Sequence, residues 1–491
     1  MKDCENNSAR LLRLLNDSDI SASTNASGDG GRVIINNPQG TLLVERDSSI
    51  NSNSGDLVGA ITQSGGIEIT TDRLVVQDKG DIRTNTRGSI PGGSITIVAR
   101  EIEIVGEVSA SASETATGNG GTLEIEADSI TVDRGFIGSE SGVMATGDAG
   151  AITIRTRELF IENGGSISAT ALNDGDAGNL TITGEKVELV GRGEKEELAV
   201  SSDNGIAGNL TLNAGLLRLE NNATITVNSD SNQAGILEIN AGSVSLNNSA
   251  FEAISSRGEN SGNITVNISG ALLRLENQSR ITAEAREGAN GGNVTLNAPN
   301  GFILARPSGN SDILANAEFG RGGNIDVQTN AIFGLEERDP LTDFSDFNAS
   351  SEFNTDGEIV LATLGIDPSR GLSELPIDVV DVAGLVATGC LGGNRSGVED
   401  QGEYTVTDRG GIAQSPTDLL FPEGGVANLA TLDNDGNLSD AAAVTAVEMD
   451  QPLEEAQGLA FNADGQVVIV SHTSAATSDR SALPATHCRE L

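Results

Sequence analysis

The sequence predicts an all-β fold: a right-handed parallel β-helix of 11–12 coils with three short strands per coil, followed by a less regular C-terminal segment. Three observations predict it. A unit of about 28 residues recurs along most of the chain, apolar residues within each unit come in i, i+2 pairs, and aromatic residues are scarce.

One copy of the unit runs from Gly150 to Gly178 and reads GAITIRTRELFIENGGSISATALNDGDAG. It contains three apolar pairs, each with the spacing of a strand that has one buried face. The pairs are Ile152 and Ile154, Leu159 and Ile161, and Ile167 and Ala169. Asn and Gly lie between the second and third pairs, as expected for turns, because both residues tolerate positive φ.

Each copy begins at an anchor glycine, and the residues 2 and 4 positions after every anchor are apolar. The nine intervals between Gly65 and Gly323 are 27–31 residues long, and the two outer intervals are 34 residues. This period is too short for propeller blades, and three strands per unit exclude the leucine-rich repeat. The anchors are Gly31, Gly65, Gly93, Gly121, Gly150, Gly178, Gly208, Gly235, Gly262, Gly292, Gly323 and Gly357.

The composition agrees with a solenoid whose core consists of thin aliphatic layers. The chain of 491 residues has 61 Gly, 11 Phe, one Tyr and no Trp. Its 71 acidic and 29 basic residues give a net charge of −42, which opposes binding to nucleic acid or to an anionic membrane. The sequence contains no run of 18 apolar residues, so we expect no membrane-spanning helix.

We divide the chain into four parts. Residues 20–366 form the β-helix, 367–400 a linker, and 401–491 a C-terminal segment with a hairpin around Asn462–Gly465. Residues 1–19 are either an N-terminal cap, in which the leucines at 11, 12, 14 and 15 form a short amphipathic element, or a remnant of a longer protein. The start of the chain lacks the apolar region of a signal peptide.

An asparagine directly follows several anchors, and we interpret it as a ladder of side chains that bond along the axis of the rod. The alternative is that these side chains line a binding groove. The residues are Asn179, Asn209, Asn263, Asn293 and Asn324.

No catalytic or cofactor-binding residues are predicted. Polysaccharide-active β-helix enzymes gather Asp with Lys or Arg on one face, often beside aromatic rings. Here the basic residues are scattered and the sequence suggests no aromatic platform. Weak calcium candidates are Asp148, Asp174 and Asp176, which lie in Gly/Asp-rich loops, although such loops are also typical of solvated turns. His472 and His487 are far apart in a polar tail and are expected at the surface.

The C-terminal segments, together with the coils, make the chain resemble the filamentous haemagglutinin-like exoproteins of two-partner secretion, an S-layer-like β-helix family. The resemblance is carried by Asp367–Leu372, by Tyr404–Gly411 (YTVTDRGG) with Pro416, and by Glu455–Val468 (EAQGLAFNADGQVV). The family usually has Trp at the position of Leu459 and Gly at that of Asp408. The family's N-terminal secretion domain has no counterpart in this sequence, which corresponds to the C-terminal part of such a protein.

The resemblance implies a secreted or outer-membrane surface-associated rod with an adhesin-like or structural, non-enzymatic role. A full-length form would engage an outer-membrane two-partner-secretion transporter, whereas export of this chain alone is not expected. Its partners would be cell-surface glycans or proteins, met through the loops at 112–120, 171–177, 201–207, 285–291 and 306–322. The alternatives are a polysaccharide-active β-helix enzyme and a calcium-stiffened extracellular matrix component.

An extracellular location also favours a disulfide bond between Cys390 and Cys488, which bracket the C-terminal segment, and leaves Cys4 single.

Overall fold

The computed structural model describes residues 10–24, 30–55, 65–113, 115–191, 196–257 and 261–363, and two strands at 458–461 and 467–470. The chain divides into two compact units, Met1–Ile377 and Asp378–Leu491. The first unit is a parallel β-helix, so the predicted fold class is confirmed.

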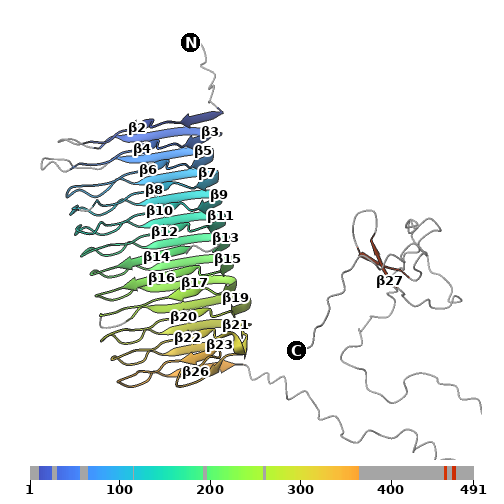
Figure 1. Ribbon diagram of the computed structural model, residues 1–491. Coiled ribbons are helices and arrows are strands. Elements are labelled where there is room, and N and C mark those ends of the chain that lie inside the picture. Colours follow the sequence, from blue (N-terminus) through green and yellow to red (C-terminus); the bar gives the residue numbers. More distant parts are fainter. Residues whose placement is uncertain are drawn as a thin grey trace, which may run out of the picture. The chain divides into compact units, whose positions relative to one another are not determined.

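Two 13-stranded parallel sheets run along the rod, and the chain alternates between them once per coil (Figure 1). The first sheet contains the long strands β1 (Leu11–Leu14), β3 (Arg32–Val44), β5 (Gly66–Val76), β7 (Ile95–Ile104), β9 (Leu123–Asp133), β11 (Ile152–Glu162), β13 (Leu180–Val190), β15 (Leu210–Glu220), β17 (Ile236–Asn247), β19 (Asn263–Glu276), β21 (Val294–Ala305), β23 (Ile325–Phe333) and β26 (Ile359–Thr363).

The second sheet contains the short strands. These are β2 (Asp19–Ser21), β4 (Ser49–Asn51), β6 (Asp81–Arg83), β8 (Glu107–Ser109), β10 (Phe136–Gly138), β12 (Ser166–Ser168), β14 (Glu197–Ser202), β16 (Thr224–Ser229), β18 (Ala250–Glu252), β20 (Arg280–Thr282), β22 (Asp312–Leu314), β24 (Glu336–Glu337) and β25 (Asp346–Asn348). A 3-10 turn, η1 (Pro307–Gly309), precedes β22.

The first two strands expected in each coil are continuous in the structure. In β11 the buried residues are first Ile152 and Ile154, and then Leu159 and Ile161. The inward positions therefore change from even to odd numbers across 155–157, where no side chain is buried and the strand turns a corner without leaving the sheet. The third expected strand is the short one, and single β-bridges continue the stacking beyond it, as between Ser141 and Ala171.

The core is a stack of equivalent apolar side chains. The position 2 residues after each anchor forms one unbroken column from Val33 to Ile359, and each member pairs with its equivalent in the next coil. Almost all of these side chains are fully buried. The inward register predicted for positions 2 and 4 is therefore confirmed.

The anchor glycines are required by the close approach of successive coils. A Cβ atom on Gly178 would lie 2.0 Å from the carbonyl oxygen of Gly150, and one on Gly150 would lie 1.9 Å from that of Gly121. The same contact recurs at every anchor from Gly65 to Gly357, always against the preceding anchor's carbonyl. Any side chain at this corner would push two coils apart, so glycine repeats with the coil.

The β-helix begins earlier than expected. Leu11–Leu14 form β1 and pair with Thr41–Val44, so these leucines are strand residues rather than an amphipathic cap, and the expected boundary at residue 20 is wrong. Leu12 and Leu14 alternate with outward residues and pack towards the core, which is the period of a strand. The segment was misjudged because an isolated four-residue strand carries no repeat signal of its own.

In the second unit, β27 (Gly458–Phe461) and β28 (Val467–Val470) pair antiparallel, which confirms the predicted hairpin. The three cysteines, the two histidines, the linker and the stretch Tyr404–Gly411 lie outside the described residues. Among the residues that are described, no helix combines the length and the apolar character needed to cross a bilayer.

Candidate functional site

Polar side chains at the corners of the coils bond along the rod, as predicted for the asparagines that follow the anchors. The Asn179 side-chain oxygen accepts a hydrogen bond from the backbone N–H of Asn209 at 2.8 Å, and Asn263 does the same for Asn293 at 2.8 Å. These amides bond to the backbone of the next coil. They therefore stabilise the stacking of coils and do not line a groove.

A second ladder, which the sequence analysis missed, links amide to amide. Asn240 donates to Asn213 at 3.0 Å, Asn267 donates to Asn240 at 2.7 Å, and Asn297 donates to Asn267 at 2.9 Å. The signal was present in the sequence, because each of these residues lies five positions after an anchor glycine in four consecutive coils.

The calcium candidates belong to a third axial column. The Asp148 carboxylate accepts the backbone N–H of Asp176 at 2.9 Å, and the Asp176 carboxylate accepts that of Ile206 at 2.8 Å. Asp174 accepts a bond from the Asn204 amide at 3.2 Å. Within the described part of the chain, no three Asp, Glu, His or Cys side chains are placed to hold a metal ion. The structure thus gives these carboxylates a role in tying loops of neighbouring coils together.

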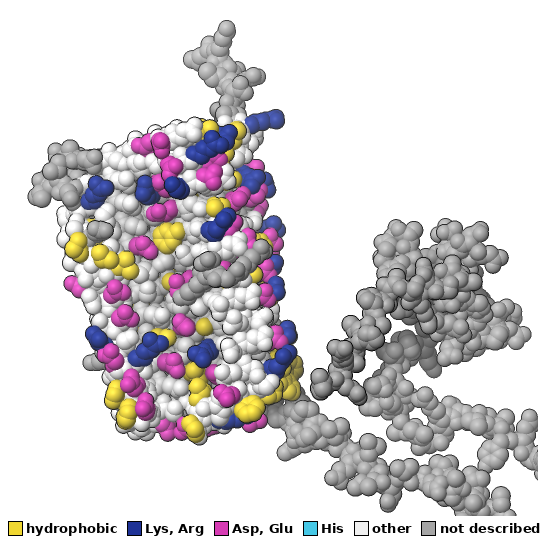
Figure 2. All heavy atoms as spheres, viewed as in Figure 1, with side chains coloured by type: hydrophobic (Ala, Val, Ile, Leu, Met, Phe, Trp, Pro, Cys, Tyr) yellow, Lys and Arg dark blue, Asp and Glu magenta, His cyan; other side chains and the backbone are white. Residues whose placement is uncertain are grey.

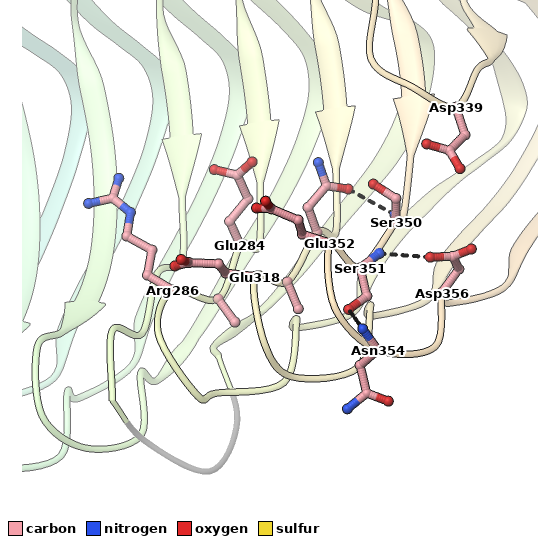
Figure 3. A pocket seen from close by; sticks show the side chains of 12 residues that line it. Glu284, Arg286, Glu318, Asp339, Ser350, Ser351, Glu352, Asn354 and Asp356 are labelled. Atoms are coloured by element: carbon pink, nitrogen blue, oxygen red, sulfur yellow. Dashed lines mark hydrogen bonds between the residues drawn. The ribbon is translucent and has the colours of Figure 1, made fainter.

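An open groove of about 530 Å³ lies at the C-terminal end of the described β-helix (Figure 3). It lies over the loops that follow β20, β22 and β25, together with Asp339 after β24, and it includes parts of the predicted contact segments 285–291 and 306–322. We call it the acidic groove, and its lining residues are Glu284, Ala285, Arg286, Asn316, Ala317, Glu318, Asp339, Ser350, Ser351, Glu352, Asn354 and Asp356. The prediction of a single loop at 306–322 is wrong, because η1 and the buried strand β22 lie within it.

The stacking of coils determines how these residues line up. Bridges join Ala285 to Ala317 and Ala317 to Ser351, so these three residues form one column. Each is flanked by polar residues, and the side following the bridge carries Arg286, Glu318 and Glu352 in successive coils. Because stacked strands lie about 4.8 Å apart, the two glutamates are neighbours along the rod axis. Figure 3 shows Glu284, Glu318 and Glu352 along the same open stretch of surface.

Hydrogen bonds within the last loop fix the floor of the groove. The Asp356 carboxylate accepts the backbone N–H of Ser351 at 2.8 Å, and the Ser351 hydroxyl accepts that of Asn354 at 2.9 Å. Glu318 accepts the backbone N–H of Glu287 at 3.1 Å through one oxygen. No hydrogen bond holds the carboxylates of Glu284 and Glu352 to another described residue, and both face the open groove.

Two stacked phenylalanines accompany the groove, and they correct the expectation that the chain has no aromatic platform. The rings of Phe319 and Phe353 lie 4.8 Å apart between centroids at an angle of 13°, and the residues are 52% and 63% exposed. Each directly follows a groove glutamate in the sequence. Both lie four residues before an anchor glycine, which is the sequence signal that could have identified the pair.

Some of the groove carboxylates and the exposed ring pair therefore belong to the same two loops, although the rings are not among the residues that line the groove. The groove contains five carboxylates, from Glu284, Glu318, Asp339, Glu352 and Asp356, and one guanidinium, from Arg286. On the face of the molecule that Figure 2 shows, acidic side chains are interspersed with Lys and Arg. Carboxylates accept hydrogen bonds from hydroxyl or ammonium groups, and ring faces pack against apolar C–H surfaces.

The carboxyls with the largest pKa shifts lie outside the groove. Burial raises the pKa of Asp312 to about 6, although its carboxylate accepts the backbone N–H of Asp346 at 3.1 Å. Burial likewise raises the pKa of Asp81 to about 6, despite its ion pair with Arg83 at 2.8 Å. Asp312 is buried and Asp81 is partly buried in the short-strand sheet, so both shifts follow from the packing of coils.

Comparison with known proteins gives no match: no protein-family model, no curated protein and no solved structure matches the chain. Its function is therefore inferred from the fold and from the acidic groove.

Proposed function

We propose that this protein is a non-enzymatic, adhesin-like structural rod that attaches to cell-surface glycans through the acidic groove. The observation that carries the proposal is the combination of groove carboxylates with the stacked pair Phe319 and Phe353. A sugar ring has a hydroxyl edge and an apolar C–H face, and this combination offers a partner to each.

The organisation of the coil supports a binding role for the loops. At the corners, asparagine and aspartate side chains are hydrogen-bonded to the next coil, and the inward positions are fully buried. The loops after the short strands vary in length and sequence from coil to coil, as is typical of the binding face of a solenoid. The proposed contact surface therefore follows these loops, and the acidic groove is a hollow within it.

Attachment to glycans suits a protein at the outside of a cell. The resemblance to two-partner-secretion exoproteins supports an extracellular or outer-membrane surface location, reached through an outer-membrane transporter in a full-length form. The net charge of −42 favours neutral glycans or cationic surfaces as partners over anionic ones.

The test is a binding measurement with purified protein on immobilised neutral polysaccharides and on intact cells. The variants Phe319→Ala with Phe353→Ala, and Glu318→Gln with Glu352→Gln, are each expected to weaken binding at least about tenfold, as interface hot spots do. The groove changes leave the anchors and the buried columns intact, so the rod is expected to remain folded.

Matched controls lie in interior coils. Val98→Ala with Ile236→Ala removes exposed apolar groups from the long strands β7 and β17, away from the loops of the acidic groove, and Glu124→Gln with Glu126→Gln removes two outward carboxylates. Both are expected to change binding less than about twofold, as contacts outside an interface hot spot do. Equal losses in the groove and control variants would reject the groove as the attachment site. Binding that disappears with added salt for every variant would instead indicate a cationic protein partner.

A further inference from the structure

The described β-helix exposes half of a coil at each of its ends. At the N-terminal end, β1 pairs with the second half of β3, at Thr41–Val44, and leaves the first half of β3 without a described neighbour on that side. At the C-terminal end, β26 pairs with the first half of β23, at Ile325–Thr329, and leaves the second half of β23 without one. Each end therefore lacks, within the described residues, the half that the other end has.

The two half-coils are complementary in register. β26 pairs with Ile325–Thr329, which is the first half of β23. Leu11, the first residue of β1, is equivalent through the pairing of successive strands to Ala331, which lies in the second half of β23. Together β26 and β1 would fill both halves of one long strand, and only the position equivalent to Asn330 between them would stay empty.

The backbone groups at the two edges also match. In each coil the N–H of the residue 2 positions after the anchor donates to a carbonyl of the next coil, as Ile325 does to Glu358 at 2.9 Å. Ile359 holds the same position in β26, so its N–H points to the open edge. In a stacked second copy, the equivalent acceptor would be the carbonyl of Arg32.

The side chains at the two edges differ from those of the interior coils. The residue 3 positions after each anchor points outward. It is polar in every interior coil, whereas the members of this column in the two end coils are apolar: Ile34 is 62% exposed and Val360 is 43% exposed. The adjacent column ends in opposite charges, Arg32 at one end and Glu358 at the other. The polar interior members of the first column are Glu68, Thr96, Glu124, Thr153, Thr181, Thr211, Glu238, Thr265, Thr295 and Asp326.

We propose that a second copy of this chain docks head to tail, so that β26 of one copy and β1 of the next complete a shared coil. Ile359 and Leu361 would then be covered by Val33 and Ile35, which continues the apolar columns through the junction. Val360 would meet Ile34, and Glu358 would meet Arg32. Such a contact joins two different surfaces and does not close, so it would generate a linear filament.

This inference goes beyond attachment and does not depend on it. A filament would repeat the acidic groove once per copy, at intervals of roughly 60 Å from the strand spacing, and would bind multivalently. Failure of glycan binding would leave assembly unaffected, because assembly is measured without a ligand.

The experiment is sedimentation velocity on the full chain over a range of concentrations, with two edge variants. Ile34→Pro removes a backbone N–H from the N-terminal edge, and Leu361→Pro removes one from the C-terminal edge. Proline is tolerated at both edges of a single copy, because these N–H groups point away from the sheet and would find a partner only in the shared coil. The wild-type chain is expected to form multiples of its 50.3 kDa mass. Each variant alone is expected to be monomeric, and an equimolar mixture is expected to form dimers and nothing larger, because one intact junction remains per pair.

Circular dichroism and thermal unfolding verify that the edge variants are folded. If a proline variant is not, Arg32→Glu with Ile34→Asp at one end and Val360→Asp with Leu361→Asp at the other provide the same mixing test. Ile206→Ser, which alters an exposed apolar residue far from both ends, is the control and should assemble as the wild type does.

Several outcomes would overturn the proposal. A full chain that stays monomeric at the highest concentration would do so. If only one variant loses assembly, two identical ends pair with each other. If the mixture of variants remains monomeric, the N-terminal and C-terminal edges do not join. Assembly unchanged in both variants would place the contact elsewhere on the rod.

Discussion

Replacing Ile182 with Asp tests the inward register at the centre of the rod. Ile182 is fully buried in β13 and stacks between Ile154 and Leu212. Losing its buried side chain costs about 2–3 kcal/mol. Keeping the new carboxyl neutral at pH 7 costs about 4 kcal/mol more, since each pKa unit is worth about 1.36 kcal/mol. The expected loss in free energy of unfolding is therefore about 6 kcal/mol.

The matched control is Thr181→Asp, one residue away on the outward side and flanked in its column by Thr153 and Thr211. Its expected effect is within about 0.5 kcal/mol, as for most surface changes. Native-state hydrogen exchange is the assay, because a solenoid opens locally and loses protection first around the altered coil. We expect Ile182→Asp to expose the amides of β11, β13 and β15 and Thr181→Asp to leave them protected.

Acidity provides a further check on the same variant. Burial raises the pKa of the new carboxyl in the folded state, so the penalty grows as the pH rises above the unfolded-state pKa of about 3.9 and declines as the pH falls towards it. Ile182→Asp should therefore recover most of the ionisation cost, about 4 kcal/mol, between pH 7 and pH 4. Equal destabilisation by the two substitutions, or a loss that does not change with pH, would refute the inward register.

Three further predictions concern other parts of the coil and chain. Gly178→Ala should destabilise the fold strongly, because the new Cβ would lie 2.0 Å from the Gly150 carbonyl oxygen. Gly184→Ala should be tolerated, because the atom nearest to its Cβ would be 3.3 Å away. Similar melting temperatures for the two variants would contradict the steric requirement for glycine at the anchors. Burial raises the pKa of Asp312 from 3.8 to about 6, so its ionisation opposes folding increasingly as the pH rises through this range. Asp312→Asn should therefore melt at a higher temperature than the wild type above pH 6 and at the same temperature near pH 4. An advantage of equal size at both pH values would argue against a buried titrating carboxyl. Cys390 and Cys488 should resist thiol labelling in protein oxidised outside the cell and become reactive after reduction, and free thiols at both positions before reduction would exclude the bond.

The sequence predicted those features that each coil must repeat. The anchor glycines, the apolar residues at positions 2 and 4 and the asparagines after the anchors recur because every coil meets the same neighbours above and below. The hairpin around Asn462–Gly465 was predictable from local turn chemistry alone. Repetition thus converted weak local signals into a reliable fold prediction.

Features that occur once or twice were missed for the same reason. β1 is a four-residue strand that pairs with residues about 30 positions further on, so its leucines had no local context. The pairing of Phe319 with Phe353 depends on loops of equal length in two successive coils. The acidic groove combines residues from four segments, those after β20, β22, β24 and β25. Such geometry is not encoded in the period of the repeat.

The central claim is that the rod binds glycans at the acidic groove without converting them. The most direct measurement is to incubate purified protein with a polysaccharide that it retains, and then to determine both the bound fraction and the chain length of the recovered polysaccharide. The account predicts retention that falls at least about tenfold in Phe319→Ala with Phe353→Ala, and a polysaccharide of unchanged length. A shortened polysaccharide, or retention that is the same in the wild type and this variant, would contradict it.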